Sequence, residues 1–517
     1  MRIPAETSKG LLIALLLAAC RGEVASMEAA AAGAQGQAGH GGAAESDPTQ
    51  VPEIFNWWDD DGERDALLAI KEVHSKRTGV IFSESIKRDA DNARAQLEER
   101  VAERNPPDAF HANVGMDLLK WTGRNNSPSG LLPLDELLEE DDAAQIDPAL
   151  VKLTRNNDHA YGIPVNVHRL NSLFYNVKVM AACGVEPPTT IEELKEAART
   201  IRNSDAEGCQ GITPLVIGAS EPWVLSMLVF EMIYFAWGSP ADYYCYWSGM
   251  YPNGKTLQPA VQKTLETARE LFCAEDPEGS GAFGYFNSDA RTTAWPDALK
   301  RLADGKAAMA PMGDWARGYL LSHDKIPGKD FKVVPFPGRA DGQNVFVFTS
   351  DAFVVLDGGR HPEPAKELLR TFASIEGQIA FNLHKGSIPS RLDLNYEKIR
   401  ECLQDPSPCW DSMPDISEEW LDDSYRQTMD DYRNDARVLA MSGTVPEPAM
   451  RDLSEELYAS LSPADDCNLE MVERYLLSNY VSLDRQGTYR DFEDLFGDST
   501  PCGSDTGGAA QSDSSAQ

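Results

Sequence analysis

The sequence of 517 residues lacks any apolar stretch of the roughly 20 residues that a transmembrane helix needs, and it is poor in basic side chains. Its 47 Lys and Arg stand against 82 Asp and Glu, which gives a formal net charge of −35. A surface this acidic repels phosphate backbones and anionic lipid headgroups. We therefore expect no nucleic acid partner and no binding to an anionic membrane surface, whereas a neutral or cationic ligand remains possible.

Motifs for catalysis and for metal binding are also missing. No C-x-x-C pair occurs and the eight His are scattered, so we expect no metal site. No G-x-S-x-G is present, and we expect neither an enzyme nor a cofactor. Residues 249–256 fit the phosphate-loop pattern G-x-x-x-x-G-K-T, but Pro252 removes an amide donor and Pro259 delays any following helix. We interpret this stretch as a turn.

The first twenty residues indicate export. Arg2 and Lys9 flank the start of the chain, and the apolar run 11–17 has the length of a signal-peptide core. Leu17-Ala-Ala-Cys20 resembles a bacterial lipobox, so we expect a signal peptide over 1–19 and a lipid on Cys20. An ordinary secretory peptide with an incidental Cys is the alternative. The expected location is extracytoplasmic, with the lipid as the anchor to a bacterial membrane.

Eight further cysteines support export. An even number of cysteines in an exported chain indicates disulfides, and we expect nearest neighbours in the sequence to pair. They are Cys183, Cys209, Cys245, Cys273, Cys402, Cys409, Cys467 and Cys502.

Composition divides the chain into a folded part between two polar ends. Residues 20–52 are rich in Ala, Gly and Gln and cannot offset their ordering entropy, so they predict a flexible tether; 501–517 predict a disordered tail. Between them, short apolar runs alternate with helical patterns, which predicts βαβ units, parallel sheets and an α/β fold of two doubly wound lobes. The expected parts are 53–164 for most of the N-terminal lobe, rejoined by part of 307–375; 165–306 for most of the C-terminal lobe; and 376–500 for its remainder and a helical C-terminal segment.

Particular elements are predicted within these lobes. A strand at 54–58 is followed by a helix that ends near Gly79 and by a second strand. Thr190 and Glu193 have the spacing of a capping box at the start of a helix. The apolar run 307–310 predicts a strand that ends just before Asp314.

Trp57 and Trp58 lie at the end of the first predicted strand, with an acidic turn and Glu63 after them. Ligands of doubly wound folds bind beyond the carboxyl ends of the strands. Aromatic rings beside carboxylates suit the C–H faces and hydroxyls of a neutral sugar. Either ring could instead belong to the core, and strand alternation predicts that the two rings point to opposite sides. The spacing of Asp59 to Asp61 does not fit an EF-hand, so we interpret it as a solvated turn.

Several short motifs together resemble the extracellular solute-binding proteins of ABC-type sugar importers, in particular the glucose-type branch in its lipoprotein form. The likeness runs in order from about 53 to 460. It implies a periplasmic-binding-protein-like fold of two lobes joined by a hinge, with a sugar bound between them and no reaction. The motifs are Trp57-Trp58 with Glu63, Asn105-Pro-Pro-Asp108, 161–169, Phe174-Tyr-Asn176, Met312-Gly-Asp-Trp-Ala316, 345–353, Lys385-Gly-Ser-Ile-Pro-Ser-Arg391 and 442–457.

The resemblance implies nine ligand-binding residues: Trp57, Trp58, Glu63, Asn166, His168, Asp314, Trp315, His384 and Lys385. The first three would line the N-terminal side of the cleft, the next two would lie where the chain crosses between lobes, and the last two would approach from the far lobe. Asp314 would hold sugar hydroxyls. The alternative for Asp314 is a cap on the following helix.

By the same resemblance, the chain would deliver a mono- or oligosaccharide to an ABC permease of the inner membrane, as a monomer. A secreted, glycosidase-like enzyme with two cleft carboxylates is the alternative, and turnover separates the two. A receptor partner or scavenger without a transporter is a third possibility. The family often has Thr-Ser-Gly-Gly where this chain has Asp59-Asp-Asp-Gly62, which favours a larger or partly cationic ligand.

Overall fold

The computed structural model describes most of the chain between Val51 and Met441. The described residues are 51–59, 61–86, 90–122, 130–247, 257–273, 284–339, 345–407, 409, 416–434, 439–441, 456, 457, 460, 461, 472 and 476. Several expected features lie outside these residues: the signal peptide, Cys20, the tail and the stretch 249–256. Of the expected tether, only 51 and 52 are described. No helix within these ranges is long and apolar enough to cross a membrane.

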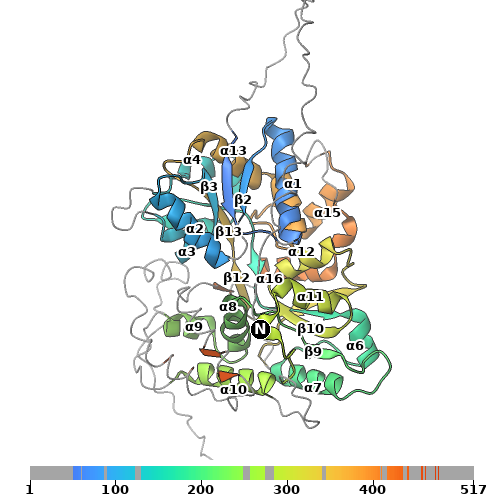
Figure 1. Ribbon diagram of the computed structural model, residues 1–517. Helices are drawn as coiled ribbons and strands as arrows, with labels where there is room; N and C mark the ends of the chain where they lie inside the picture. The colour runs from blue at the N-terminus through green and yellow to red at the C-terminus, as the bar shows by residue number, and fades with distance from the viewer. Residues whose placement is uncertain are drawn as a thin grey trace, which may run out of the picture. The chain divides into compact units, whose positions relative to one another are not determined.

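A five-stranded sheet with the order β2-β1-β3-β13-β6 forms the centre of the first lobe. Its strands are β1 (Glu53–Asn56), β2 (Ser83–Ile86), β3 (Ala109–Asn113), β6 (Ile163–Pro164) and β13 (Asp351–Val355). β1 pairs in parallel with β2 and with β3, whereas β13 runs antiparallel to its two neighbours. Helix α1 (Asp61–Thr78) connects β1 to β2, as the predicted βαβ unit requires, and lies beside β2 in Figure 1.

The other first-lobe helices cover this sheet. They are α2 (Ala90–Ala102), α3 (Met116–Leu119), α4 (Asp135–Leu138), η1 (Ala143–Gln145), α5 (Pro148–Lys152), α13 (Pro362–Ala373) and α14 (Ile375–Lys385). α14 packs along α1, and its Phe381 joins a buried cluster with Trp58, Phe353 and Phe372. The apolar face of α14 therefore belongs to the first lobe.

A four-stranded sheet with the order β11-β8-β10-β9 forms the centre of the second lobe. Its strands are β8 (Ser172–Asn176), β9 (Thr213–Leu215), β10 (Ala307–Met312) and β11 (Phe331–Pro335). β10 runs parallel to β9 and antiparallel to β8. β10 occupies the predicted apolar run and ends two residues before Asp314.

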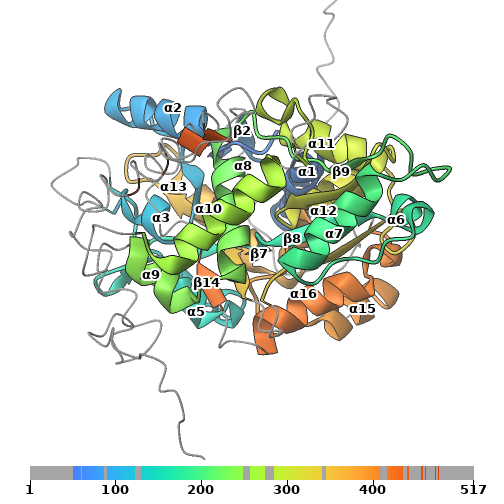
Figure 2. The ribbon, with the colours of Figure 1, turned by 90° about the horizontal axis from the view of Figure 1, so that it is seen from below.

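Helices surround the second sheet, with α6 and α7 lying along it in Figure 2. They are α6 (Val177–Cys183), α7 (Ile191–Arg202), α8 (Pro222–Ser226), the π-helical η2 (Met227–Ile233), η3 (Tyr234–Ala236), α9 (Pro240–Trp247), α10 (Pro259–Phe272), η4 (Ala290–Thr292), α11 (Trp295–Ala303) and α12 (Trp315–Ser322). The capping box of α7 is confirmed, because the Glu193 N–H donates to Thr190 Oγ1 at 3.2 Å and the Thr190 N–H donates to Glu193 at 3.3 Å. α10 begins at Pro259, as expected.

Among the described residues, two chain segments cross between the lobes, and β14 and the segment after α14 lie against them. β7 (His168–Arg169) follows β6 and pairs antiparallel with β12 (Phe346–Thr349), which precedes β13. β14 (Leu439–Met441) pairs with the other edge of β12. The segment after α14 joins them through a bridge between Ile388 and Val167. A short hairpin of β4 (Arg155–Asn156) and β5 (His159–Ala160) precedes β6. We call the two crossing segments at 163–169 and 346–355, together with the adjoining segment 386–391, the hinge.

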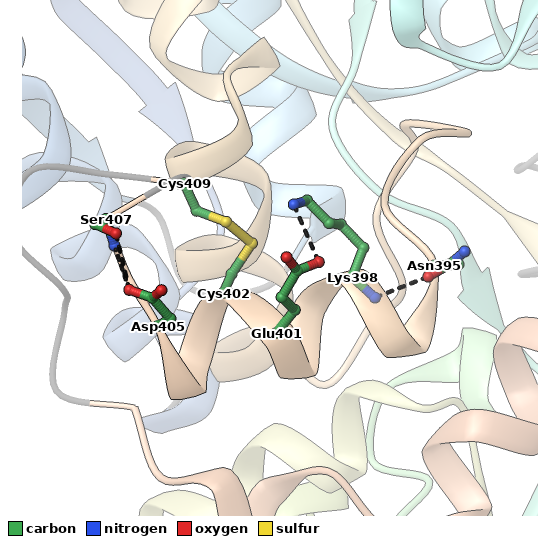
Figure 3. The surroundings of a disulfide bond; sticks show 7 residues. All are labelled: Asn395, Lys398, Glu401, Cys402, Asp405, Ser407 and Cys409. Atoms are coloured by element: carbon green, nitrogen blue, oxygen red, sulfur yellow. Dashed lines mark hydrogen bonds and ion pairs between the residues drawn. A yellow bond between two sulfur atoms is a disulfide. The ribbon is translucent and has the colours of Figure 1, made fainter.

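The C-terminal segment contributes α15 (Tyr396–Gln404), η5 (Glu418–Trp420) and α16 (Asp423–Asn434). Asn395 caps α15, and a disulfide between Cys402 and Cys409 fastens its other end (Figure 3). A second disulfide joins Cys183 to Cys209. Both link nearest neighbours in the sequence, whereas Cys467 and Cys502 lie outside the described residues.

Candidate ligand-binding site

Trp57 and Trp58 directly follow β1. Since β1 ends at Asn56, both rings lie beyond the strand, and strand alternation does not set their directions. Both rings approach the imidazole of His111, with centroids 3.9 and 4.2 Å from its centroid. Trp58 is 1% exposed and also packs on Phe381, whereas Trp57 stays partly exposed.

His111 lies in the middle of β3, and no motif in the sequence singled it out. Its Nε2 lies 2.8 Å from Asp351 Oδ1, while its Nδ1 is buried without a hydrogen-bond partner among the described residues. Burial lowers the pKa of His111 more than Asp351 raises it, so the ring is neutral near pH 7. A neutral ring that donates from Nε2 leaves Nδ1 as an acceptor. Next to two indole rings, this unpaired acceptor suits a ligand hydroxyl.

Asp351, at the start of β13, is the centre of a buried polar cluster. The Asn166 side-chain amide donates to Asp351 Oδ2 at 2.7 Å, and the Asp351 N–H donates to Asn166 Oδ1 at 2.8 Å. His168 Nε2 lies 3.1 Å from the same Oδ2. The cluster holds the Asp351 carboxylate in one orientation between two histidines, His111 and His168.

Asp314 lies at the carboxyl end of the second-lobe strand β10. It precedes α12 but makes no side-chain capping bond to it, so the capping alternative is not observed. Its Oδ2 instead accepts the Arg169 N–H at 2.9 Å, and its Oδ1 pairs with His168 Nδ1. Asp314 is therefore fixed to the hinge strand β7 and is 5% exposed.

Trp315 and Trp223 add aromatic surface from the second lobe. The Trp315 ring stands edge-on to His168 at 5.4 Å and to Trp223 at 5.8 Å. A Cβ at Gly313 would lie 2.1 Å from the Trp315 ring, so only glycine leaves room for the indole there. Trp223, at the start of α8, is a site candidate that its local sequence does not reveal.

Glu63 and Lys385 form a largely buried ion pair between α1 and α14. The Lys385 side chain is 3% exposed and that of Glu63 14%, and the ammonium lies 5.1 Å from the Trp58 ring centroid. Both belong to helices of the first lobe. The expectation that Lys385 reaches the site from the far lobe is therefore wrong, because the apolar face of α14 packs on the first-lobe core.

His384 is the one of the nine expected residues that joins neither of the two groups of side chains described below. Its Nδ1 lies 2.8 Å from the Ala380 carbonyl oxygen, and its ring stands edge-on to Trp420 of η5 at 5.0 Å. It also lies on α14 and thus in the first lobe. The structure gathers Trp57, Trp58, Glu63 and Lys385 around one end of α1, and Asn166, His168, Asp314 and Trp315 around the hinge; His111 and Asp351 link the two groups.

A seam of three glycines borders this arrangement, where α12 of the second lobe meets α1 and α14. A Cβ at Gly62 would lie 2.3 Å from the Gly318 carbonyl carbon, and one at Gly318 would lie 2.3 Å from the His384 carbonyl oxygen. Gly386 completes the contact with a φ of +86°, and a Cβ there would lie 2.6 Å from the Asp314 carbonyl oxygen. We call Gly62, Gly318 and Gly386 the glycine seam.

The charges of the hinge cluster are coupled. Burial alone would lower the pKa of His168, but Asp314 and Asp351 raise it to about 9. Burial opposes ionisation of Asp351, yet the two histidines hold its pKa well below the ordinary value. Because its pKa is raised, His168 is an imidazolium that lies between two carboxylates.

Other candidate sites are weaker. A surface hollow of about 330 Å³ near α11 is lined by charged groups that already pair with each other, such as Arg301 with Asp289 at 2.7 Å and Lys300 with Asp304 at 3.2 Å. Within the described ranges, no group of three or more His, Cys, Asp or Glu is placed to hold a metal ion.

Two α/β lobes with polar and aromatic side chains gathered at the hinge define a ligand-binding protein of the two-lobed class. Residues 91–379, more than half of the chain, match the family of bacterial extracellular solute-binding proteins, and the chain belongs to this family.

Individual relatives agree with this assignment. An uncharacterized ABC transporter extracellular-binding protein of Pyrococcus horikoshii is 29% identical over 349 residues, which cover 66% of this chain and 72% of the relative. A probable sugar-binding periplasmic protein of Rhizobium meliloti is 29% identical over 355 residues, 66% of this chain and 76% of the relative. The solved structure of the solute receptor AcbH, described as exclusive for β-D-galactopyranose, matches with a TM-score of 0.64 at 16% identity and covers 84% of this chain and 99% of that chain. This last likeness shows the fold.

Proposed function

We propose that the chain is an extracytoplasmic receptor that binds an uncharged mono- or oligosaccharide between its lobes and delivers it to an ABC permease. The observation that carries this proposal is the buried Nδ1 of His111, which belongs to a ring beside Trp57 and Trp58 and has no hydrogen-bond partner in the described part of the chain. Aromatic rings cover the C–H faces of a sugar, and an unpaired buried acceptor gains most from a hydroxyl donor. The sugar-binding name of the Rhizobium meliloti relative supports the same ligand class.

The charge of the site favours an uncharged ligand. Lys385 neutralises Glu63, and the His168 imidazolium offsets one of the two hinge carboxylates. Asp61, in the acidic turn that favoured a cationic ligand, lies 3.2 Å from His323 Nε2 instead of standing alone. Among the described residues of the site, most carboxylates therefore already contact a protein group, which disfavours a strongly cationic ligand.

The arrangement of the carboxylates favours binding over hydrolysis. A glycosidase needs one carboxylic acid whose pKa is raised so that it can protonate the leaving group. The pKa of Asp351 is lowered instead, and Asp314 and Asp351 share hydrogen bonds to the same imidazole. Neither carboxylate is arranged as a general acid.

The proposal includes a lipid anchor at Cys20, a monomeric receptor and the glucose-type branch of the family. The lipobox-like Leu17-Ala-Ala-Cys20 after an apolar run supports the anchor. Cys20→Ala should release the protein from the membrane fraction of the producing cells. A variant that stays in the membrane fraction would contradict lipidation.

Calorimetry with D-glucose, D-galactose, D-xylose, maltose and raffinose tests the proposed function. At least one sugar should bind, whereas glucosamine and glucuronate should bind at least tenfold more weakly than their uncharged parent. Trp57→Ala should weaken sugar binding at least about tenfold, equivalent to about 1.4 kcal/mol, because it removes a ring from the site. Trp237→Ala, which changes a partly buried ring on the second lobe beside Thr267, is the matched control.

Two results would overturn the proposal. One is the absence of binding by every sugar in the panel to folded protein. The other is turnover: after prolonged incubation, mass spectrometry should return maltose and raffinose unchanged, and a hydrolysed product would assign the chain to the enzymes.

A further inference from the structure

His168 has no ring nitrogen left for a ligand. Its Nδ1 pairs with Asp314 Oδ1, and its Nε2 lies 3.1 Å from Asp351 Oδ2. The residue is 2% exposed. Asn166 Nδ2 lies 2.9 Å from His168 Nε2, which follows if both groups donate to the same Asp351 oxygen. The ring is thus saturated by protein groups, unlike that of His111.

The two carboxylates that His168 contacts belong to different lobes. Asp314 follows β10 of the second sheet, and Asp351 begins β13 of the first sheet. His168 itself lies on β7, in the segment that crosses between them. A single imidazole therefore joins the end of one sheet to the other.

We propose that His168 is a positioning residue of the hinge: its imidazolium holds Asp314 and Asp351 together across the two lobes and so fixes the site for the ligand. This assignment rests on the proposed function and goes beyond it, because His168 acts through the two carboxylates and not on the sugar. Asn166 supports it by fixing the orientation of Asp351 through two hydrogen bonds.

Charge explains why the proton matters. Without it, two buried carboxylates would share one site with no cation between them, which is unfavourable. The other charged groups around the cluster do not replace it. His111 on β3 is neutral, the Arg169 guanidinium lies 2.6 Å from Asp431 of α16, and Lys385 of α14 is paired with Glu63.

The direction of the pH dependence follows. The pKa of His168 is raised to about 9 in the folded protein, above its ordinary value of 6.5. The stabilisation from its proton is therefore complete below about pH 6.5 and is lost as the pH rises through about 9. We expect constant ligand affinity between about pH 6 and 8 and weaker binding above about pH 9.

NMR titration of the histidine rings in the sugar-free protein tests the assignment independently of any ligand. His168 should titrate near pH 9, and Asp314→Asn or Asp351→Asn should each lower its pKa by about 1 or more, since each removes one negative neighbour. His74, a buried histidine 2.8 Å from Thr371 and with a pKa lowered by burial to about 4, should be unchanged in both variants. A His168 that titrates at or below pH 7, or that ignores both substitutions, would overturn the proposal.

Calorimetry with the tightest-binding sugar of the panel, from pH 6 to 10, provides the second test. His168→Gln should bind at least about tenfold more weakly at pH 7 and should lose the decrease in affinity near pH 9. His168→Gln with Asp351→Asn should regain at least about threefold, because one uncompensated carboxylate is gone, whereas His74→Gln should keep the wild-type profile. Wild-type affinity in His168→Gln, or persistence of its pH step, would contradict the proposal. Failure of every sugar to bind would instead refute the proposed function and leave the NMR result to decide on His168.

Discussion

Two neighbouring contacts between the lobes, both among the described residues, have opposite chemistry. In the hinge cluster, His168 joins Asp314 and Asp351 through buried, charged hydrogen bonds. In the glycine seam, the backbone of α12 touches α1 and α14 at Gly62 and Gly318, with no room for a side-chain atom. The first contact depends on a proton and the second only on shape.

The two contacts therefore control the position of one lobe against the other in different ways. Charged groups in a low-dielectric site respond to pH and to the loss of one partner. Close packing of small residues responds to added volume and not to pH. The Glu63–Lys385 pair lies beside both contacts, since Glu63 follows Gly62 and Lys385 precedes Gly386. Substitutions at each position should therefore fail in different ways.

The largest effect is expected for Lys385→Met. It leaves the Glu63 carboxylate buried without its partner, which should lower the free energy of unfolding by about 3 to 5 kcal/mol. Urea denaturation followed by tryptophan fluorescence measures this loss. Lys178→Met, which breaks an exposed pair with Asp330, should cost about 1 kcal/mol or less.

A double variant separates charge from packing at this pair. Glu63→Gln with Lys385→Met removes both charges and should recover most of the stability. No recovery would mean that Lys385 acts by packing over the Trp58 ring and not by neutralising Glu63.

A smaller but more specific effect is expected for Gly318→Ala. The added methyl would meet the His384 carbonyl oxygen at 2.3 Å, so that α12 must move away from α14. Such overpacking costs about 1 to 3 kcal/mol, which corresponds to about 5- to 150-fold weaker sugar binding if it opposes lobe closure. Calorimetry should show this loss equally at pH 6 and pH 8. Gly130→Ala is the matched control, because a Cβ there meets nothing within 4 Å. Equal sugar affinities of the two variants would show that the glycine seam is not a contact of lobe closure.

The local elements of the fold could be predicted from the sequence. The first βαβ unit and the capping box of α7 depend on residues within a few positions of each other, so periodicity and spacing reveal them. The lobe that carries α14 could not be predicted in this way. It depends on the pairing of β13 with β3, about 240 residues apart, as in Asp351 opposite Asn113.

The same limit applies to the candidate site. Trp57 and Trp58 stand out because tryptophan is a rare residue and these two are adjacent in the sequence, at the end of a predicted strand. His111 does not, because a single histidine in an apolar strand has no spacing that marks it, and its unpaired nitrogen exists only once Asp351 has taken the other. His168 was found by resemblance, but its two carboxylate partners are set by tertiary contacts at sequence separations of 146 and 183.

The smallest effect is expected at the exposed rim of the glycine seam, where His323 at the end of α12 lies 3.2 Å from Asp61 at the start of α1. Their side chains are 34% and 61% exposed, so solvent and salt screen the pair. Pairs of this kind contribute about 0.2 to 1 kcal/mol. At pH 5, where histidine side chains are ordinarily protonated, His323→Gln should therefore weaken sugar binding less than about fivefold at low ionic strength, and the difference from wild type should vanish in 0.5 M salt. Calorimetry at both salt concentrations measures this. A loss as large as that of Gly318→Ala, or one that persists in high salt, would show that the seam holds the lobes by charge as well as by shape.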